Sequence, residues 1–194
     1  MNAVIRSFWV SFTLLLLAAS PLRAQEGIGA ILDWINKLSG PRFGGVGATF
    51  YAPLYGEGGE ERSYDTSIRY RLSVAMHFSY DSDDAVDPDG ASIRMLTIRN
   101  SVEFPVRHIP LDFAVGFSLH RFSGDPDTFW HWSVPLRAQY RVRLSPTASL
   151  RFGPTVDVFP KFAADDFQPL TVDVSRDRTE AVFGFLVGVD FQVF

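Results

Sequence analysis

The strongest constraint on the fold is an alternation of apolar and polar residues with a period of two, which recurs along most of the chain. Its clearest example runs from Ile68 to Tyr80, where apolar side chains occupy every second position and Arg69, Arg71 and His77 lie between them. Because successive side chains of a β-strand point to opposite faces, this spacing predicts strands with one apolar and one polar face.

The same alternation predicts seven strands, joined by segments rich in Gly, Pro, Asp and Ser. The predicted strands cover 43–52, 68–80, 92–104, 111–120, 129–144, 149–159 and 181–193. Closed antiparallel barrels that span a membrane normally have an even number of strands. The stretch from Leu170 to Val174 also alternates, and we expect it to supply the eighth strand.

Two segments precede the alternating region. Residues 1–24 have the parts of a cleaved secretory signal peptide: Arg6, an apolar stretch over 8–19, and a small residue, Ala24, at the expected cut. That stretch is shorter than the ~20 residues that a spanning helix needs. Within 25–41, apolar residues recur at helical spacing up to Gly40-Pro41, which predicts an amphipathic periplasmic helix over 27–39. This helix could pack on one end of the domain or lie on the bilayer surface.

Composition narrows the class of protein. Of the 18 basic residues only Lys37 and Lys161 are lysines, whereas water-facing strands usually carry many. The absence of cysteine excludes a disulfide framework and a thiolate metal site. The net charge of −4 argues against nucleic acid as a partner.

The alternation does not by itself say which face meets water. The polar faces contain many small residues, among them Ser73, Ala75 and Gly116, which suits the narrow interior of a small barrel. The apolar faces are long and aromatic, as in the lipid-facing wall of a membrane barrel. We therefore predict an all-β fold over 42–194: a closed antiparallel up-and-down transmembrane β-barrel of about eight strands, with the short N-terminal helix before it.

On this assignment a basic set of side chains points into the lumen. Because a buried charge must be paired, we expect a salt-bridge network that fills the interior; a small anion-selective conduit or binding site is the alternative. No cofactor or metal site is expected. The predicted network comprises Arg69, Arg71, Arg99, Glu103, Asp112, Arg137, Arg141, Arg143, Arg151, Asp157 and Asp190.

The last residues carry a resemblance to a known family. Val189, Phe191 and Val193 alternate, and Phe194 follows one position out of phase. This pattern resembles the C-terminal signature by which outer-membrane β-barrels are recognised by their assembly machinery. The resemblance implies a small barrel of a Gram-negative-type outer membrane. Its implied partners are the assembly machinery and outer-membrane lipid, including lipopolysaccharide, and its implied role is structural, adhesive or limited to small solutes, without catalysis.

Two other functions stay open. The pair His131-x-Ser133 is similar to the site of outer-membrane lipid A deacylases, although no glutamate follows until Glu180. A secreted soluble barrel that binds an apolar ligand is the other alternative. The segment 81–90 carries five aspartates and is expected to be a solvated acidic turn, or to bridge lipopolysaccharide phosphates through a divalent ion.

Overall fold

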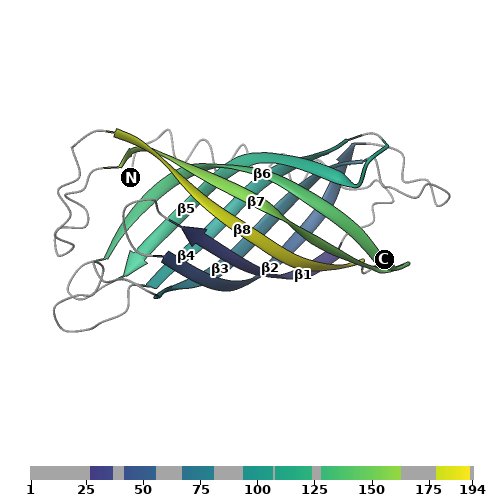
Figure 1. Ribbon diagram of the computed structural model, residues 1–194, viewed down its shortest axis with the longest axis horizontal. Helices are drawn as coiled ribbons and strands as arrows, with labels where there is room; N and C mark the ends of the chain where they lie inside the picture. The colour runs from purple at the N-terminus through teal and green to yellow at the C-terminus, as the bar shows by residue number, and fades with distance from the viewer. Residues whose placement is uncertain are drawn as a thin grey trace.

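The computed structural model describes residues 27–36, 42–55, 67–80, 94–106, 108–123, 128–162 and 178–192, which form one closed barrel of eight antiparallel strands (Figure 1). Each strand pairs with the next along the chain, and β8 pairs with β1 to close the barrel. The predicted up-and-down topology is therefore confirmed. The strands are β1 (Gly27–Asn36), β2 (Arg42–Tyr55), β3 (Ile68–Tyr80), β4 (Arg94–Pro105), β5 (Leu111–Ser123), β6 (Thr128–Ser145), β7 (Ala148–Phe162) and β8 (Arg178–Gln192).

The prediction of a helix over 27–39 is wrong, because Gly27–Asn36 forms strand β1. Ile31 and Ile35 point into the barrel and are buried, whereas Ile28 and Leu32 point outward. Both faces of this strand are therefore apolar, so the period of two is hidden and the spacing imitates a helix. β1 supplies the eighth strand. The stretch 170–174 and the signal peptide predicted over 1–24 lie outside the described residues.

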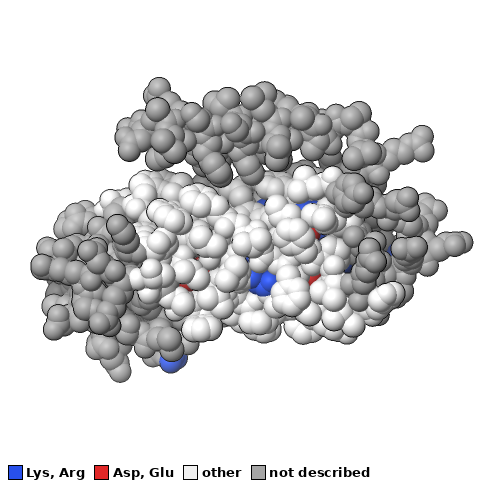
Figure 2. Space-filling model, turned by 90° about the horizontal axis from the view of Figure 1, so that it is seen from above, with Lys and Arg blue, Asp and Glu red and all other residues white. Residues whose placement is uncertain are grey.

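The outer wall of the barrel is apolar. Large hydrophobic side chains on every strand except β7 have at least a third of their surface exposed, including Leu32, Val74, Phe113, Trp132 and Phe185. In the face seen in Figure 2, the described surface is mostly uncharged, with few blue or red atoms. The polar positions of the same strands point inward and are buried. This arrangement is the reverse of a water-soluble barrel and is that of a transmembrane β-barrel.

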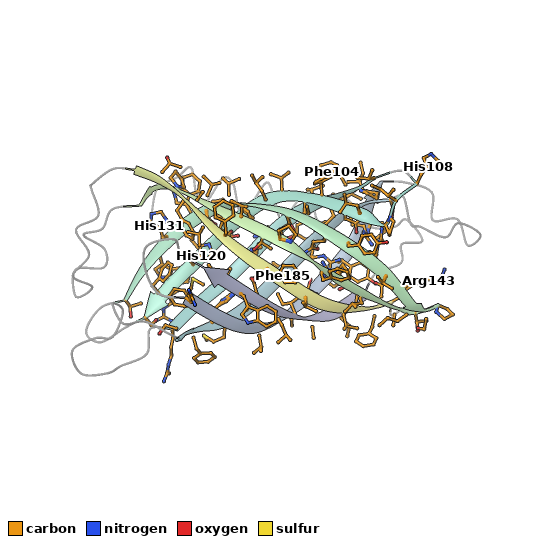
Figure 3. All side chains as sticks on the ribbon, viewed as in Figure 1. Phe104, His108, His120, His131, Arg143 and Phe185 are labelled. Carbon is orange, nitrogen blue, oxygen red and sulfur yellow. The ribbon has the colours of Figure 1, made fainter. Side chains whose placement is uncertain are left out.

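The two ends of the barrel differ in their connections. At one end, which we call the terminal end, Gly27 pairs with Gln192, and the connections are 56–67, 106–110 and 146–147. The other end, the loop end, has the connections 37–41, 81–93, 124–127 and 163–177. Figure 3 shows His108 and Arg143 at the terminal end and His131 toward the loop end. No helix in the described part of the chain is long and apolar enough to cross a membrane.

Candidate functional site

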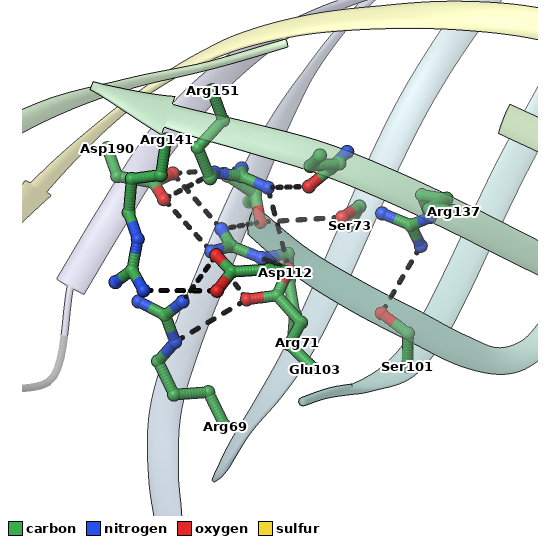
Figure 4. A network of polar contacts seen from close by, with 12 residues as sticks. Arg69, Arg71, Ser73, Ser101, Glu103, Asp112, Arg137, Arg141, Arg151 and Asp190 are labelled. Atoms are coloured by element: carbon green, nitrogen blue, oxygen red, sulfur yellow. Dashed lines mark hydrogen bonds and ion pairs between the residues drawn. The ribbon is translucent and has the colours of Figure 1, made fainter. Parts of the chain in front are cut away.

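The lumen contains the charged and polar side chains that could carry a function, and the first group of them lies toward the terminal end. Arg71 of β3 is at its centre and is fully buried. Its Nε and Nη2 donate to the two oxygens of Glu103 at 2.5 and 3.1 Å, and its Nη1 and Nη2 donate to those of Asp190 at 3.0 and 2.9 Å (Figure 4). Arg71 therefore bridges β4 and β8, which are not neighbours in the sheet.

Arg151 of β7 completes this group. Its Nε lies 2.5 Å from Asp190, and its Nη1 lies 3.5 Å from Glu103. The same Nη1 donates to Gln139 Oε1 of β6 at 2.6 Å. Each of the two carboxylates is thus shared by at least two guanidinium groups, which satisfies charges that would be costly to bury alone.

A second pair of arginines lies nearer the terminal mouth. Arg69 donates to Asp112 at 2.9 Å, and its Nε lies 3.6 Å from Glu103. Arg141 donates to the other oxygen of Asp112 at 3.1 Å and is half-buried. The arginines and carboxylates of this end form one continuous network, the charged cluster, which comprises Arg69, Arg71, Glu103, Asp112, Arg141, Arg151 and Asp190.

A closed circuit of hydrogen bonds crosses the middle of the lumen. Arg99 donates to Asp33 at 2.8 Å and to Asp157 at 2.9 Å. Asp157 accepts from the Ser133 hydroxyl at 2.9 Å, and Ser133 Oγ lies 2.8 Å from His120 Nε2. Thr97 of β4 and His77 of β3 complete this circuit, which we call the polar ring. The ring draws on six strands and comprises Asp33, His77, Thr97, Arg99, His120, Ser133 and Asp157.

The chemistry of the side chains fixes which atom donates in several hydrogen bonds of the ring. A carboxylate only accepts, so the Ser133 proton faces Asp157 and His120 Nε2–H donates to the serine oxygen. The Nδ1 atom of a neutral His120 must then accept from the Thr97 hydroxyl, 3.0 Å away. Thr97 Oγ1 also lies 3.5 Å from Nδ1 of His77, whose Nε2 lies 3.4 Å from Asp33 and closes the circuit.

Two glycines make room for these side chains. A Cβ atom on Gly45 would lie 2.3 Å from the ring of His77, and a Cβ atom on Gly29 would lie 2.5 Å from a carboxylate oxygen of Asp190. Only glycine permits an approach this close. The fully buried imidazole and carboxylate therefore pack directly on the backbone of β2 and β1.

Apart from His131, the described side chains that fill the lumen at the loop end are apolar. Six buried side chains from six strands pack together there, and the rings of Phe43 and Phe122 meet edge to face across the interior at 6.4 Å. The ring of Phe159 lies 4.9 Å from that of His120 and so joins this cluster to the polar ring. The cluster, which we call the apolar plug, comprises Ile35, Phe43, Met95, Phe122, Phe159 and Val182.

Most of the residues predicted for the lumen lie in it, with one correction. Arg143 is exposed at the terminal end, and its guanidinium donates to the main-chain oxygens of Ser145 and Pro146. Along β6, Arg143 is on the same face as Arg137 and Gln139, which point into the lumen, but it lies beyond the end of the interior. It therefore takes no part in the network.

The predicted network left out several polar residues that make hydrogen bonds in the lumen, among them Asp33, His77, Thr97, His120 and Gln139. Asp33 was missed because its strand reads as a helix. The others occupy lumenal positions of the predicted strands, so the strand parity could have identified them. Their partners could not be identified, because those depend on the stagger between strands.

Arg137 differs from the other buried arginines. Its only hydrogen bond within the described chain runs from Nη2 to Ser101 Oγ at 3.2 Å, and Nε and Nη1 have no partner there. In Figure 4 it stands apart from the charged cluster. It lies on β6 between Ser133 of the polar ring and Gln139 beside the cluster.

The structure does not pair His131 with Ser133. Ser133 is fully buried, and its hydroxyl is bonded to His120 and Asp157. Nδ1 of His131 lies 2.9 Å from the main-chain oxygen of Trp132, and its ring lies 5.7 Å from that of Phe159 in the plug. The serine hydroxyl is therefore part of the polar ring and lies away from the lipid-facing wall.

Two further predictions concern metal ligands and the assembly signal. Among the described residues, no group of three His, Cys, Asp or Glu side chains could hold a metal ion. The acidic segment 81–90 lies outside the described residues, as do Val193 and Phe194 of the predicted assembly signal. Val189 and Phe191 lie on the outer face of β8, where Phe191 is about half exposed.

No family model and no curated protein matches this chain. Several solved structures are similar in fold, and each aligns with 87% of this chain. The N-terminal β-barrel domain of Pseudomonas aeruginosa OprF is 9% identical over all of its length, with a TM-score of 0.46. Neisserial surface protein A is 10% identical over 96% of its length, with a TM-score of 0.46. Ail, the attachment invasion locus protein of Yersinia pestis, solved with the heparin analogue sucrose octasulfate, is 10% identical over 96% of its length, with a TM-score of 0.43.

Proposed function

We propose that this protein is an integral β-barrel of a bacterial outer membrane with a structural or adhesive role. One observation carries the proposal: the wall is apolar and aromatic, while arginines and carboxylates fill the interior. Only a hydrocarbon surrounding makes the exposed wall favourable, because a monomeric soluble protein rarely exposes so large an apolar surface. The terminal end, where β1 begins and β8 ends, would face the periplasm. The loop end, which has the two longest connections, 81–93 and 163–177, would face outward.

A closed lumen supports a structural or adhesive role over solute transport. The charged cluster, the polar ring and the apolar plug follow one another along the interior, and each draws side chains from most of the strands. An eight-stranded barrel is only wide enough for its own side chains. Parts of the molecule that contact other partners would then be the connections at the loop end.

The outer wall also has a feature that suits lipopolysaccharide as a partner. Its described charged side chains are three exposed arginines, Arg42 of β2, Arg94 of β4 and Arg121 of β5, all at the loop end. We call them the rim arginines. The Arg121 guanidinium lies 5.9 Å from the ring centre of Trp130 on the next strand, an aromatic of the interfacial kind. Guanidinium groups bind phosphate with two parallel hydrogen bonds, so this rim fits the phosphates of an anionic outer leaflet.

A pair of charge substitutions on one face of β3 tests the membrane placement. Val74 and Phe78 are both exposed on the wall, Val74 near the middle of the strand and Phe78 near its loop end. Val74→Arg should lower the free energy of unfolding by about 2–4 kcal/mol, because its charge enters the hydrocarbon, while an arginine near the interface costs only about 0–1 kcal/mol. The measurement is urea unfolding of protein refolded into lipid vesicles.

Phe78→Arg is the matched control, with Phe78→Ala to subtract the lost ring. If the two charges cost the same, or if the wild-type barrel folds in buffer without detergent or lipid, the membrane proposal fails. Fractionation with the outer membrane, and migration on a detergent gel that changes on heating, would support it independently.

A further inference from the structure

We infer that the lumen binds one small monovalent anion of the chloride type, held by Arg137, Gln139 and Thr155. The inference begins with charge. The described lumen holds five buried arginines and the half-buried Arg141 against five buried carboxylates, six against five. The five other arginines each contact one or two of those carboxylates. Arg137 makes no ion pair with any described residue, so the surplus positive charge is located there.

The orphan donors of Arg137 are buried. The residue is 4% exposed, and its Nε and Nη1 have no partner in the described chain. A guanidinium cannot lose its proton to relieve this cost under ordinary conditions. Leaving such donors unsatisfied is expensive in a closed interior, so a bound acceptor is expected.

Two neighbours of Arg137 also present unpaired polar atoms. Gln139 is two residues along β6 on the same lumenal face, and its Oε1 accepts from Arg151 at 2.6 Å. Because arginine only donates, this bond fixes the amide orientation and leaves the Nε2 donor, which has no partner, pointing elsewhere. Thr155 of β7 is directly opposite Arg137 in the sheet, and its buried hydroxyl has no partner in the described chain.

Three adjacent lumenal positions therefore offer a guanidinium, an amide and a hydroxyl, each able to donate. Cross-strand neighbours lie about 5 Å apart and alternate residues of a strand about 7 Å apart, so one ion could reach all three. The nearest carboxylate along β7, Asp157, already accepts from Arg99 and Ser133. A single charge balances the surplus, and a monatomic ion suits an interior that side chains fill.

The test compares chloride with gluconate at equal ionic strength, using protein refolded in detergent. A ligand that binds only the folded state raises the Tm, so wild-type protein should melt several degrees higher in chloride. Arg137→Met should abolish this difference. Arg143→Met, which removes an exposed arginine outside the lumen, should retain it.

Direct counting keeps the inference testable if the Arg137 variant does not fold. Equilibrium dialysis of wild-type protein with radioactive chloride should find one ion per barrel, and crystals grown with bromide should show an anomalous peak beside Arg137. Equal Tm values in the two salts, with no bound halide and no bromide peak, would mean that water satisfies these donors and would overturn the inference.

Discussion

The two ends of the barrel place their charges on opposite sides of the wall. At the terminal end the arginines and carboxylates are inside, and the wall outside carries side chains such as Phe104 and Phe191. At the loop end the interior is the apolar plug, and the rim arginines are outside. In the described chain, the lumenal arginines of the terminal end are thus neutralised by carboxylates inside, whereas the charged side chains of the outer wall lie at the loop end, where the proposed orientation would bring them to lipid headgroups.

The difference also separates two kinds of stabilisation. In the charged cluster, each side chain depends on partners from strands that are distant in the sequence, such as Arg71 and Asp190. In the plug, side chains such as Met95 contribute mainly by leaving water or lipid and by packing. Removing one side chain should therefore lower the free energy of unfolding more in the charged cluster than in the plug, because it leaves an unpaired buried charge.

The largest decrease in the free energy of unfolding is expected from Arg71→Met. This change leaves Glu103 and Asp190 buried with fewer cations, and removing one partner of a buried ion pair costs about 3–5 kcal/mol. The measurement is urea unfolding in lipid vesicles, monitored through the fluorescence of wall tryptophans such as Trp132. Arg143→Met serves as the control, since an exposed arginine should change the free energy of unfolding by no more than about 0.5 kcal/mol.

A double variant sharpens this result. Arg71→Met combined with Glu103→Gln removes one charge of each sign, so it should be more stable than Arg71→Met alone. If Arg71→Met behaved like Arg143→Met, the cluster would contribute only volume to the lumen, and the contrast between the ends would disappear.

A smaller decrease in the free energy of unfolding is expected from Met95→Ala in the plug. The side chain is almost fully buried, and truncation of a buried methionine to alanine costs about 2–5 kcal/mol. We expect the lower end of this range, because methionine is flexible and its neighbours near the mouth can relax. The same unfolding assay gives the loss, with Met76→Ala on the outer face of β3 as the control.

Planar-bilayer recordings add a second readout for this variant. The polar ring and the charged cluster remain in place behind a shortened Met95, so no ion conductance should appear. A stable current through Met95→Ala would show that the plug alone closes the lumen.

The wall of the barrel could be predicted from the sequence because strand parity is a local property. Arg69, Arg71 and Arg99 occupy the polar positions of regular strands, and their inward direction follows from the alternation alone. β1 could not be identified in this way. Ile31 packs inside against Ala75 and Leu186, while Leu32 points outward, so apolar residues on both faces removed the periodic signal.

The arrangement of the lumen could not be predicted because it depends on the stagger of the closed sheet. Arg99 pairs with Asp33, 66 positions earlier, and with Asp157, 58 positions later. Sequence spacing carries no information about such contacts. For the same reason the unpaired state of Arg137 could be found only once the partners of its neighbours were known.

The smallest effect on stability is expected at the outside of the loop end, where substitution should change binding more than folding. Replacing Arg42, Arg94 and Arg121 together with glutamine removes exposed charges, and each exposed substitution should change the free energy of unfolding by no more than about 0.5 kcal/mol. Basic groups at an anionic membrane surface contribute about 1 kcal/mol each, so affinity for vesicles containing lipopolysaccharide should fall markedly, and less so at high salt, where the attraction is already screened. Arg143→Gln at the opposite end should bind as wild type does. Equal binding by the triple variant and Arg143→Gln would mean that the rim does not contact headgroup phosphates, and the asymmetry of the wall would then need another cause.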